Sequence, residues 1–193
     1  MIDLEGLAHR FANALYGDSE MDETAKAKIE YGFSLTLGIG LTFILTMAPA
    51  ALLGTFSFTF VLMISALVTR IFSGGAHCSS YTRCLFLSLL IFVPGGVILK
   101  LLAGNAPLWL IALIYGSLIF AAVTCNFCRQ KAFSLPIALL GTVALAVGLL
   151  LKDQLLTVML PAAMGICIQT LMTTPLGQRF VEKTDFWLKQ VIK

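Results

Sequence analysis

Charged residues are scarce in this chain. Asp, Glu, Lys and Arg account for only 12% of its 193 residues, while 59% are hydrophobic and the mean hydropathy is +0.94. An average soluble domain carries about 25% charged residues, because its surface must be hydrated. Lipid makes no such demand, so the composition excludes an ordinary soluble domain and predicts an integral membrane protein. Internal repeats and low-complexity tracts are also absent from the sequence, so we expect a single membrane domain.

Acidic residues are missing from six long apolar runs. Each run is close to the length of about 20 residues that a helix needs to cross a hydrocarbon core. The predicted spans are residues 31–48, 50–69, 84–103, 107–124, 134–151 and 155–173. Because none of them contains Asp or Glu, a proton- or cation-coupled carrier is disfavoured, although a small peptide transporter stays an alternative. We therefore predict an all-α integral membrane protein with six transmembrane helices.

Two short sequences predict departures from straight helices. Met47–Ala50 is all that separates the first two spans, so we expect a tight helical hairpin that turns there. Pro94-Gly95-Gly96 lies inside the third span and predicts a kink or an unwound turn, because proline removes a backbone donor and glycine tolerates unusual dihedrals. Such a break could shape a substrate cavity, and a simple packing kink is the alternative.

Residues 1–30 form a polar leader that contains seven of the ten acidic residues. This leader lacks the basic start, the apolar run and the cleavage site of a signal peptide. Apolar residues recur in it at helical spacing: Leu4, Leu7, Ala8, Phe11 and Leu15. The pattern predicts an N-terminal amphipathic helix on the membrane surface, or alternatively a solvent-facing helix packed on the rest of the protein. Residues 31–173 are the predicted six-span catalytic domain, and residues 174–193 are a basic tail.

Basic residues segregate to one side of the predicted spans. Eleven lie on that side: Arg10, Lys26, Lys28, Arg70, Arg83, Arg129, Lys131, Arg179, Lys183, Lys189 and Lys193. Only two, Lys100 and Lys152, fall on the other side. Because the cytoplasmic loops of membrane proteins are enriched in Lys and Arg, we predict that both termini and the loop between the second and third spans are cytoplasmic.

One polar segment interrupts the apolar sequence between the second and third spans. Phe72–Cys84 reads FSGGAHCSSYTRC, and it contains His77 and Cys84 with Arg70 just before it. A cysteine thiolate is a strong nucleophile, and a nearby imidazole or positive charge favours the thiolate. A position at a helix N-terminus favours it further. These residue types are those of a hydrolase that uses a cysteine nucleophile and a histidine base.

The gap of seven residues between His77 and Cys84 constrains the backbone. In one continuous α-helix, residues seven apart stand about 10.5 Å apart along the axis. Proton transfer needs a separation of about 2.6 to 3.2 Å. A catalytic pair therefore requires a bend between Gly74 and Arg83, which Gly74-Gly75 can supply. The alternative is that His77 is an interfacial polar residue and Cys84 an inert, small apolar one.

Cys125 and Cys128 form a Cys-x-x-Cys motif after the fourth span. Such a pair can be redox-active, which makes a membrane thiol-disulfide oxidoreductase the main alternative function. The predicted cytoplasmic side is reducing, which disfavours that function. A metal site is also disfavoured, because four ligands are normally needed and no second pair stands at metal spacing. Cys78, next to His77, is the alternative nucleophile to Cys84.

The polar segment resembles the signature of the accessory gene regulator protein B (AgrB) family. In that signature a basic residue is followed by Ser-Gly-Gly-x-His and by a Cys seven positions later; here these are Arg70, Ser73–His77 and Cys84. The Ile-Glu-Tyr-Gly sequence at Ile29–Gly32, the polar leader and the six spans are also similar to the family. The resemblance covers most of the chain, and its specificity lies mainly in the thirteen residues Phe72–Cys84.

The resemblance implies a membrane cysteine endopeptidase that matures a quorum-sensing propeptide. Members of the family remove the acidic C-terminal tail of an AgrD-like propeptide, hold the remainder as a thioester and close it into a thiolactone or lactone ring. Matched residue by residue, Cys84 is the nucleophile, and His77 is the general base that also protonates the leaving amine. Arg70 contributes local charge or substrate binding, and Gly75 contributes the bend.

The resemblance also implies partners and a location. The substrate is a propeptide with an amphipathic N-terminus that lies on the membrane, and the enzyme is a homodimer in the bacterial cytoplasmic membrane. We expect contacts with lipid, and neither a cofactor nor a nucleic acid. Family members carry a run of Lys after the fourth span, where this chain has Arg129, Gln130 and Lys131. Arg129 and Lys131 could bind the acidic tail, or they could reflect topology alone.

Overall fold

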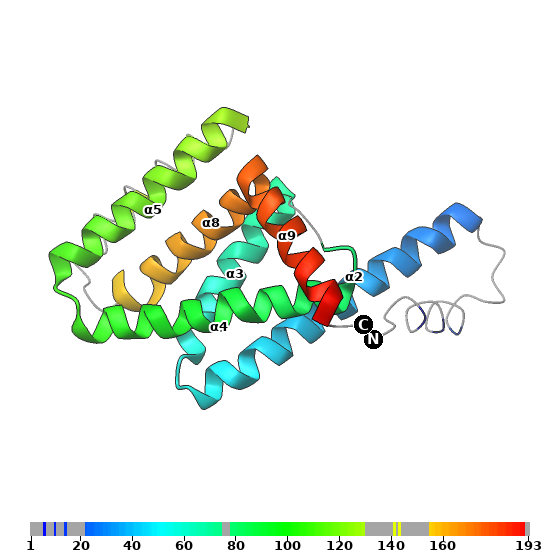
Figure 1. Ribbon diagram of the computed structural model, residues 1–193, viewed down its shortest axis with the longest axis horizontal. Coiled ribbons are helices and arrows are strands. Elements are labelled where there is room, and N and C mark those ends of the chain that lie inside the picture. Colours follow the sequence, from blue (N-terminus) through cyan, green and yellow to red (C-terminus); the bar gives the residue numbers. More distant parts are fainter. Residues whose placement is uncertain are drawn as a thin grey trace.

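The computed structural model describes residues 22–74, 78–129 and 155–191, together with five isolated positions, Gly6, Arg10, Ala14, Gly141 and Val143. Within these ranges the chain forms helices and no strand (Figure 1). The elements are α2 (Glu23–Leu52), α3 (Phe56–Ser73), α4 (Tyr81–Asn105), α5 (Leu108–Arg129), the π-helical turn η1 (Leu155–Met159), α8 (Leu160–Thr173) and α9 (Pro175–Val191).

Four helical stretches are long and apolar enough to cross a membrane, and α5 contains a shorter apolar one. The four are residues Thr24–Leu52, Phe56–Ser73, Tyr81–Asn105 and Leu156–Thr173. The prediction of an all-α membrane protein is therefore confirmed. The predicted span at 134–151 and the predicted amphipathic helix in residues 1–21 lie outside the described residues, apart from the isolated positions.

The first span is longer than its apolar run. Helix α2 has 30 residues and is about 45 Å long, which exceeds the roughly 30 Å thickness of a hydrocarbon core. The surplus lies at its N-terminal end, where Lys26, Lys28 and Glu30 provide polar side chains. The last residues of the polar leader thus continue the first transmembrane helix without a break.

The predicted turn at Met47–Ala50 is wrong. Helix α2 continues through this stretch, including Pro49, and ends at Leu52. The turn is made by Gly54, whose φ of +64° suits glycine, and two backbone bonds close it: Thr55 N–H to the Ala50 carbonyl at 2.8 Å and Gly54 N–H to the Ala51 carbonyl at 3.0 Å. Proline removes only one donor near the helix end, whereas only glycine accepts this dihedral at low cost.

Of the kink or unwound turn predicted in the third span, the unwound turn is wrong, because α4 is helical through Pro94–Gly96. Gly95 and Gly96 are buried against α3. A Cβ added at Gly95 would come within 2.9 Å of Leu62 Cδ2, and one at Gly96 would overlap the Thr59 hydroxyl. The two glycines therefore serve the close approach of two helices.

Helices α3 and α8 pack directly on each other in the interior of the described bundle (Figure 1). Gly165 lies at their contact, where a Cβ would overlap the Leu62 carbonyl oxygen and the Ser65 hydroxyl. Leu62 and Leu160 are fully buried beside this contact. Lipid is as apolar as leucine, so helices in a membrane gain from close packing rather than from burial itself, and small residues permit it.

Hydrogen bonds at the two ends of the bundle define the directions of the helices. At one end, Gln169 near the C-terminus of α8 donates from Nε2 to the carbonyl of Gly74, just after α3, at 2.7 Å. At the other end, Lys100 Nζ of α4 donates to the carbonyl of Leu53, just after α2, at 3.1 Å. Gly165 of α8 lies against Leu62 and Ser65 of α3, and Gln169, one turn later, reaches Gly74 after the end of α3, so the two helices run in the same direction, as expected for the second and sixth of six predicted spans.

The predicted basic tail forms a helix. Thr174 separates α8 from α9, and its hydroxyl donates to the Leu171 carbonyl at 2.6 Å and accepts from the Gly177 N–H at 3.2 Å. With Pro175 at the first helical position, this is a standard N-cap arrangement. Helix α9 then packs back on α8 and on α4 instead of leaving the protein. A tail without apolar runs is thus part of the folded structure.

We predict that Gly165→Ala destabilises the protein by about 1–3 kcal/mol, because the added methyl group overlaps backbone and hydroxyl atoms of α3. Gly116→Ala is the matched control, since a Cβ at Gly116 meets nothing within 4 Å. Replacing that glycine in a helix should leave stability equal or higher. Thermal unfolding of the purified variants in detergent measures both. Equal unfolding temperatures for Gly165→Ala and the wild type would contradict the packing described here.

Candidate active site

The chain bends sharply where α3 ends. Gly74 follows the helix with φ +68° and ψ −149°, a conformation open essentially to glycine alone. The buried side chain of Gln169 donates a hydrogen bond to the Gly74 carbonyl oxygen. Helix α4 starts only at Tyr81, after the extended residue Ser80. The described residues between Gly74 and Tyr81 are therefore non-helical, as the predicted bend requires, and the pairing of His77 with Cys84 stays a prediction. Residues 75–77, which include Gly75 and His77, lie outside the described residues.

Cys84 lies in the first turn of α4 and is partly buried. Its N–H donates to the Ser80 carbonyl at 3.1 Å, which places it where the helix has unpaired N–H groups and a positive dipole end. Helix α4 begins here because Ser80 is the last extended residue of the connection and the apolar run starts a few residues later. The sulfur is thus held at the polar end of an apolar helix.

Cys78 folds back onto Cys84. Its thiol and its backbone N–H lie near the Cys84 sulfur, and hydrogen bonding between the two side chains is the main influence on the pKa of Cys78. The side-chain hydrogen bond, together with burial, raises the pKa of the Cys78 thiol. Cys78 therefore keeps its proton and donates it, while the Cys84 sulfur accepts. This arrangement favours Cys84 over Cys78 as the nucleophile.

Charged side chains from two other helices act on this pair. The guanidinium of Arg70, in the last turn of α3, exerts a favourable electrostatic interaction on negative charge at the Cys84 sulfur. Asp185 of α9 opposes that charge more weakly. The sequence predicts that Arg70 contributes local charge or substrate binding, and its electrostatic influence on Cys84 is compatible with the first of these roles.

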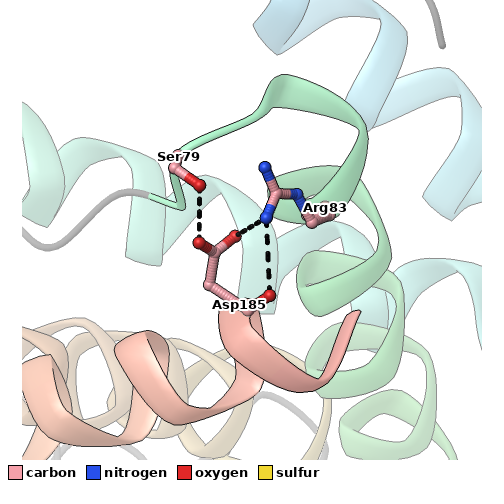
Figure 2. Close-up of polar contacts among 3 residues, drawn as sticks. All are labelled: Ser79, Arg83 and Asp185. Atoms are coloured by element: carbon pink, nitrogen blue, oxygen red, sulfur yellow. Dashed lines mark hydrogen bonds and ion pairs between the residues drawn. The ribbon is translucent and has the colours of Figure 1, made fainter. Parts of the chain in front are cut away.

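Asp185 is a site residue that the sequence did not reveal. Its carboxylate accepts a hydrogen bond from the Ser79 hydroxyl at 2.6 Å and forms an ion pair with Arg83 Nη1 at 3.2 Å (Figure 2). The same Nη1 also donates to the Asp185 backbone carbonyl at 3.5 Å. The only signal in the sequence is the helical spacing of Asp185 from the buried residues Gly177 and Val181, which places all three on one face of α9.

Tyr81 attaches the start of α4 to α2. Its hydroxyl donates to the Gly38 carbonyl at 2.6 Å and lies 3.0 Å from the Thr42 hydroxyl. A Cβ added at Gly38 would stand 2.9 Å from the Tyr81 ring, so the absent side chain makes room for the tyrosine. The turn before Cys84 is therefore fixed by contacts to α2, α8 and α9.

The other predicted site residues lie at the edge of the described part of the chain or outside it. Arg129 is the last residue of α5, and Lys131 lies outside the described residues. Cys125 and Cys128 belong to the same last turns of α5, and their side chains lie outside the described part of the chain. The predicted basic patch and the Cys-x-x-Cys motif therefore stay predictions. Cys167 is buried in α8.

Comparison with known proteins gives one result. No curated protein matches the chain, and no solved structure does. The family model described as Accessory gene regulator B matches residues 8–173, which include the whole of the turn around Cys84. The chain therefore belongs to the AgrB family, which is involved in the processing of quorum-sensing propeptides.

Proposed function

We propose that this protein is a membrane cysteine endopeptidase. It removes the C-terminal tail of an AgrD-like propeptide through a thioester on Cys84 and closes the remainder into a thiolactone or lactone ring. The observation that carries the proposal is the position of Cys84 in the first turn of α4, directly after the non-helical segment that follows Gly74, with Cys78 and Arg70 acting on its sulfur. Membership of the AgrB family supports the choice of substrate.

The reaction has two steps that balance in protons and bonds. In the first, the Cys84 thiolate attacks the carbonyl carbon of the scissile peptide bond; a C–S bond forms, the C–N bond breaks, and protonated His77 gives its proton to the leaving amine. In the second, a Cys thiol or Ser hydroxyl of the bound peptide attacks the thioester. Its proton goes to His77, and Cys84 leaves as the thiolate.

The position of Cys84 suits ring closure. Water competes with the peptide nucleophile for the thioester, so a site that excludes water favours the ring over the hydrolysed product. Cys84 lies at the start of an apolar helix and is itself partly buried. A propeptide with an amphipathic helix would gather on the same membrane surface, which raises its local concentration at the site.

The proposal includes the remaining expectations from the sequence. Both termini and the site face the cytoplasm of a bacterial membrane, the protein is a homodimer, and Arg129 and Lys131 bind the acidic tail. The proposal also keeps the role in the bend that the family resemblance assigns to Gly75. Asp185 of α9 contacts Ser79 and Arg83, which lie beside Cys84. These contacts support the proposal that α9 and the site lie on the same side of the membrane.

We predict that Cys84→Ala lowers release of the propeptide tail by more than about 1,000-fold, because the nucleophile is lost. Cys78→Ala, which removes the neighbouring thiol, should retain cleavage. Co-expression with the cognate propeptide, followed by mass spectrometry of the tail and the ring, measures both. If Cys84→Ala cleaves normally and Cys125→Ala does not, a thiol oxidoreductase that uses Cys125 and Cys128 replaces the proposal.

We predict that His77→Ala prevents accumulation of the peptide thioester on Cys84, with a loss of about 100- to 10,000-fold in the rate of acylation. Trapping with the propeptide and intact-mass analysis of the enzyme measures the rate. Acylation at the wild-type rate would remove His77 from the role of general base.

We predict that an impermeant thiol reagent added to intact cells leaves Cys84 unmodified, because the site faces the cytoplasm. The same reagent should label Cys84 in inverted membrane vesicles. Peptide mapping identifies the labelled residue in each sample. Rapid labelling of Cys84 from outside intact cells would reverse the proposed orientation.

A further inference from the structure

Helix α9 lies beyond residues 8–173, the range that the family model matches, yet it contacts the turn before Cys84. We propose that Asp185 of α9 is a positioning residue of the active site, which clamps the turn that carries Cys78 and Cys84. The inference rests on the proposed function of Cys84. It adds a residue from the C-terminal helix to a site otherwise built from α3 and the start of α4.

The carboxylate of Asp185 bridges two points on either side of the start of α4. Ser79 precedes the helix and Arg83 lies in its first turn, so both ends of the turn are held by one side chain (Figure 2). Cys84 follows Arg83 directly in sequence. The side chains of Arg83 and Asp185 are only 12% and 18% exposed, so water screens this pair less than an ion pair on an open surface.

The position of Asp185 is fixed by the way in which α9 sits on α8. Gly177 is buried at their junction, where a Cβ would overlap the Leu171 carbonyl oxygen and the Met172 backbone. Val181, one turn further, is also buried. Asp185 is the next residue at this spacing, so the packing that buries Gly177 and Val181 also turns Asp185 toward the start of α4.

The negative charge of Asp185 distinguishes a residue that positions Cys84 from one that activates its thiol. Negative charge on Asp185 opposes negative charge on the Cys84 sulfur, whereas Arg70 favours it. A residue selected to make the thiolate more reactive would carry the opposite charge. We therefore assign Asp185 a role through its contacts with Ser79 and Arg83, which fix the position of Cys84. Loss of the carboxylate should slow catalysis without slowing the chemical reactivity of the thiol.

The test compares Asp185→Asn with Glu182→Gln in the full-length membrane protein. Asparagine keeps an oxygen that can accept from Ser79 but loses the ion pair with Arg83, and Glu182 is an exposed acid on the same helix. For Asp185→Asn, we expect kcat for propeptide cleavage to fall about 10- to 100-fold with little change in KM, as expected for a displaced nucleophile. Glu182→Gln should match the wild type.

Alkylation of Cys84 by iodoacetamide, followed by peptide mapping, provides a second readout that needs no propeptide. In Asp185→Asn, Cys84 should be alkylated at least as fast as in the wild type, because an opposing negative charge has been removed. Slow cleavage combined with undiminished alkylation supports the inference. Unchanged cleavage overturns it. A parallel fall in cleavage and alkylation also overturns it, because that result indicates general damage to the fold.

If Asp185→Asn does not accumulate in the membrane, exchanging the charges of Arg83 and Asp185 tests the same ion pair. Arg83→Asp alone should be slow, and Arg83→Asp combined with Asp185→Arg should recover at least tenfold of the lost rate, about 1.4 kcal/mol. No recovery in the double variant overturns the inference. If the wild-type protein itself cleaves no propeptide, the proposed function fails as well, whereas normal cleavage by Asp185→Asn removes only the role of Asp185.

Discussion

The close contact between α3 and α8 at Gly165 fixes the geometry on which the rest of the described structure depends. Because a glycine faces the backbone of α3, the two helices approach closely along parallel directions. That alignment brings Gln169 of α8 level with the end of α3, where its amide holds the carbonyl of Gly74. The bend that leads to Cys84 is thus anchored by the packing of two membrane helices.

The turn around Cys84 is held from three directions by polar contacts that are individually modest. Gln169 fixes its beginning, Asp185 fixes the start of α4, and Tyr81 connects that start to Gly38 of α2. Each of these contacts joins a donor to an acceptor in surroundings of reduced polarity, where an unpaired group is costly. The turn is therefore determined by three helices other than the two that it joins.

The membrane helices that the structure describes can be located from the sequence, and Cys84 can be proposed as the nucleophile, because both inferences depend on local properties. Hydrophobic length defines a span, and a cysteine after a polar segment at the start of a span can be recognised from neighbours alone. The same reasoning placed the first turn at Pro49, although Gly54 makes it, because proline is a stronger breaker in water than near the end of a membrane helix. The role of Gly95 and Gly96 in packing depends on α3, which their own neighbours do not reveal.

Asp185 could not be predicted for a related reason. It stands 106 residues after Ser79, and only the fold brings the two together. The same contact also limits the length of the chain that connects α8 and α9. In an α-helix each residue turns the chain by about 100°, so one residue gained or lost at Thr174 would rotate Asp185 away from Arg83 while leaving every transmembrane helix intact. The length of the connection between α8 and α9 therefore matters as much as the identity of its residue, because it sets the direction in which Asp185 points.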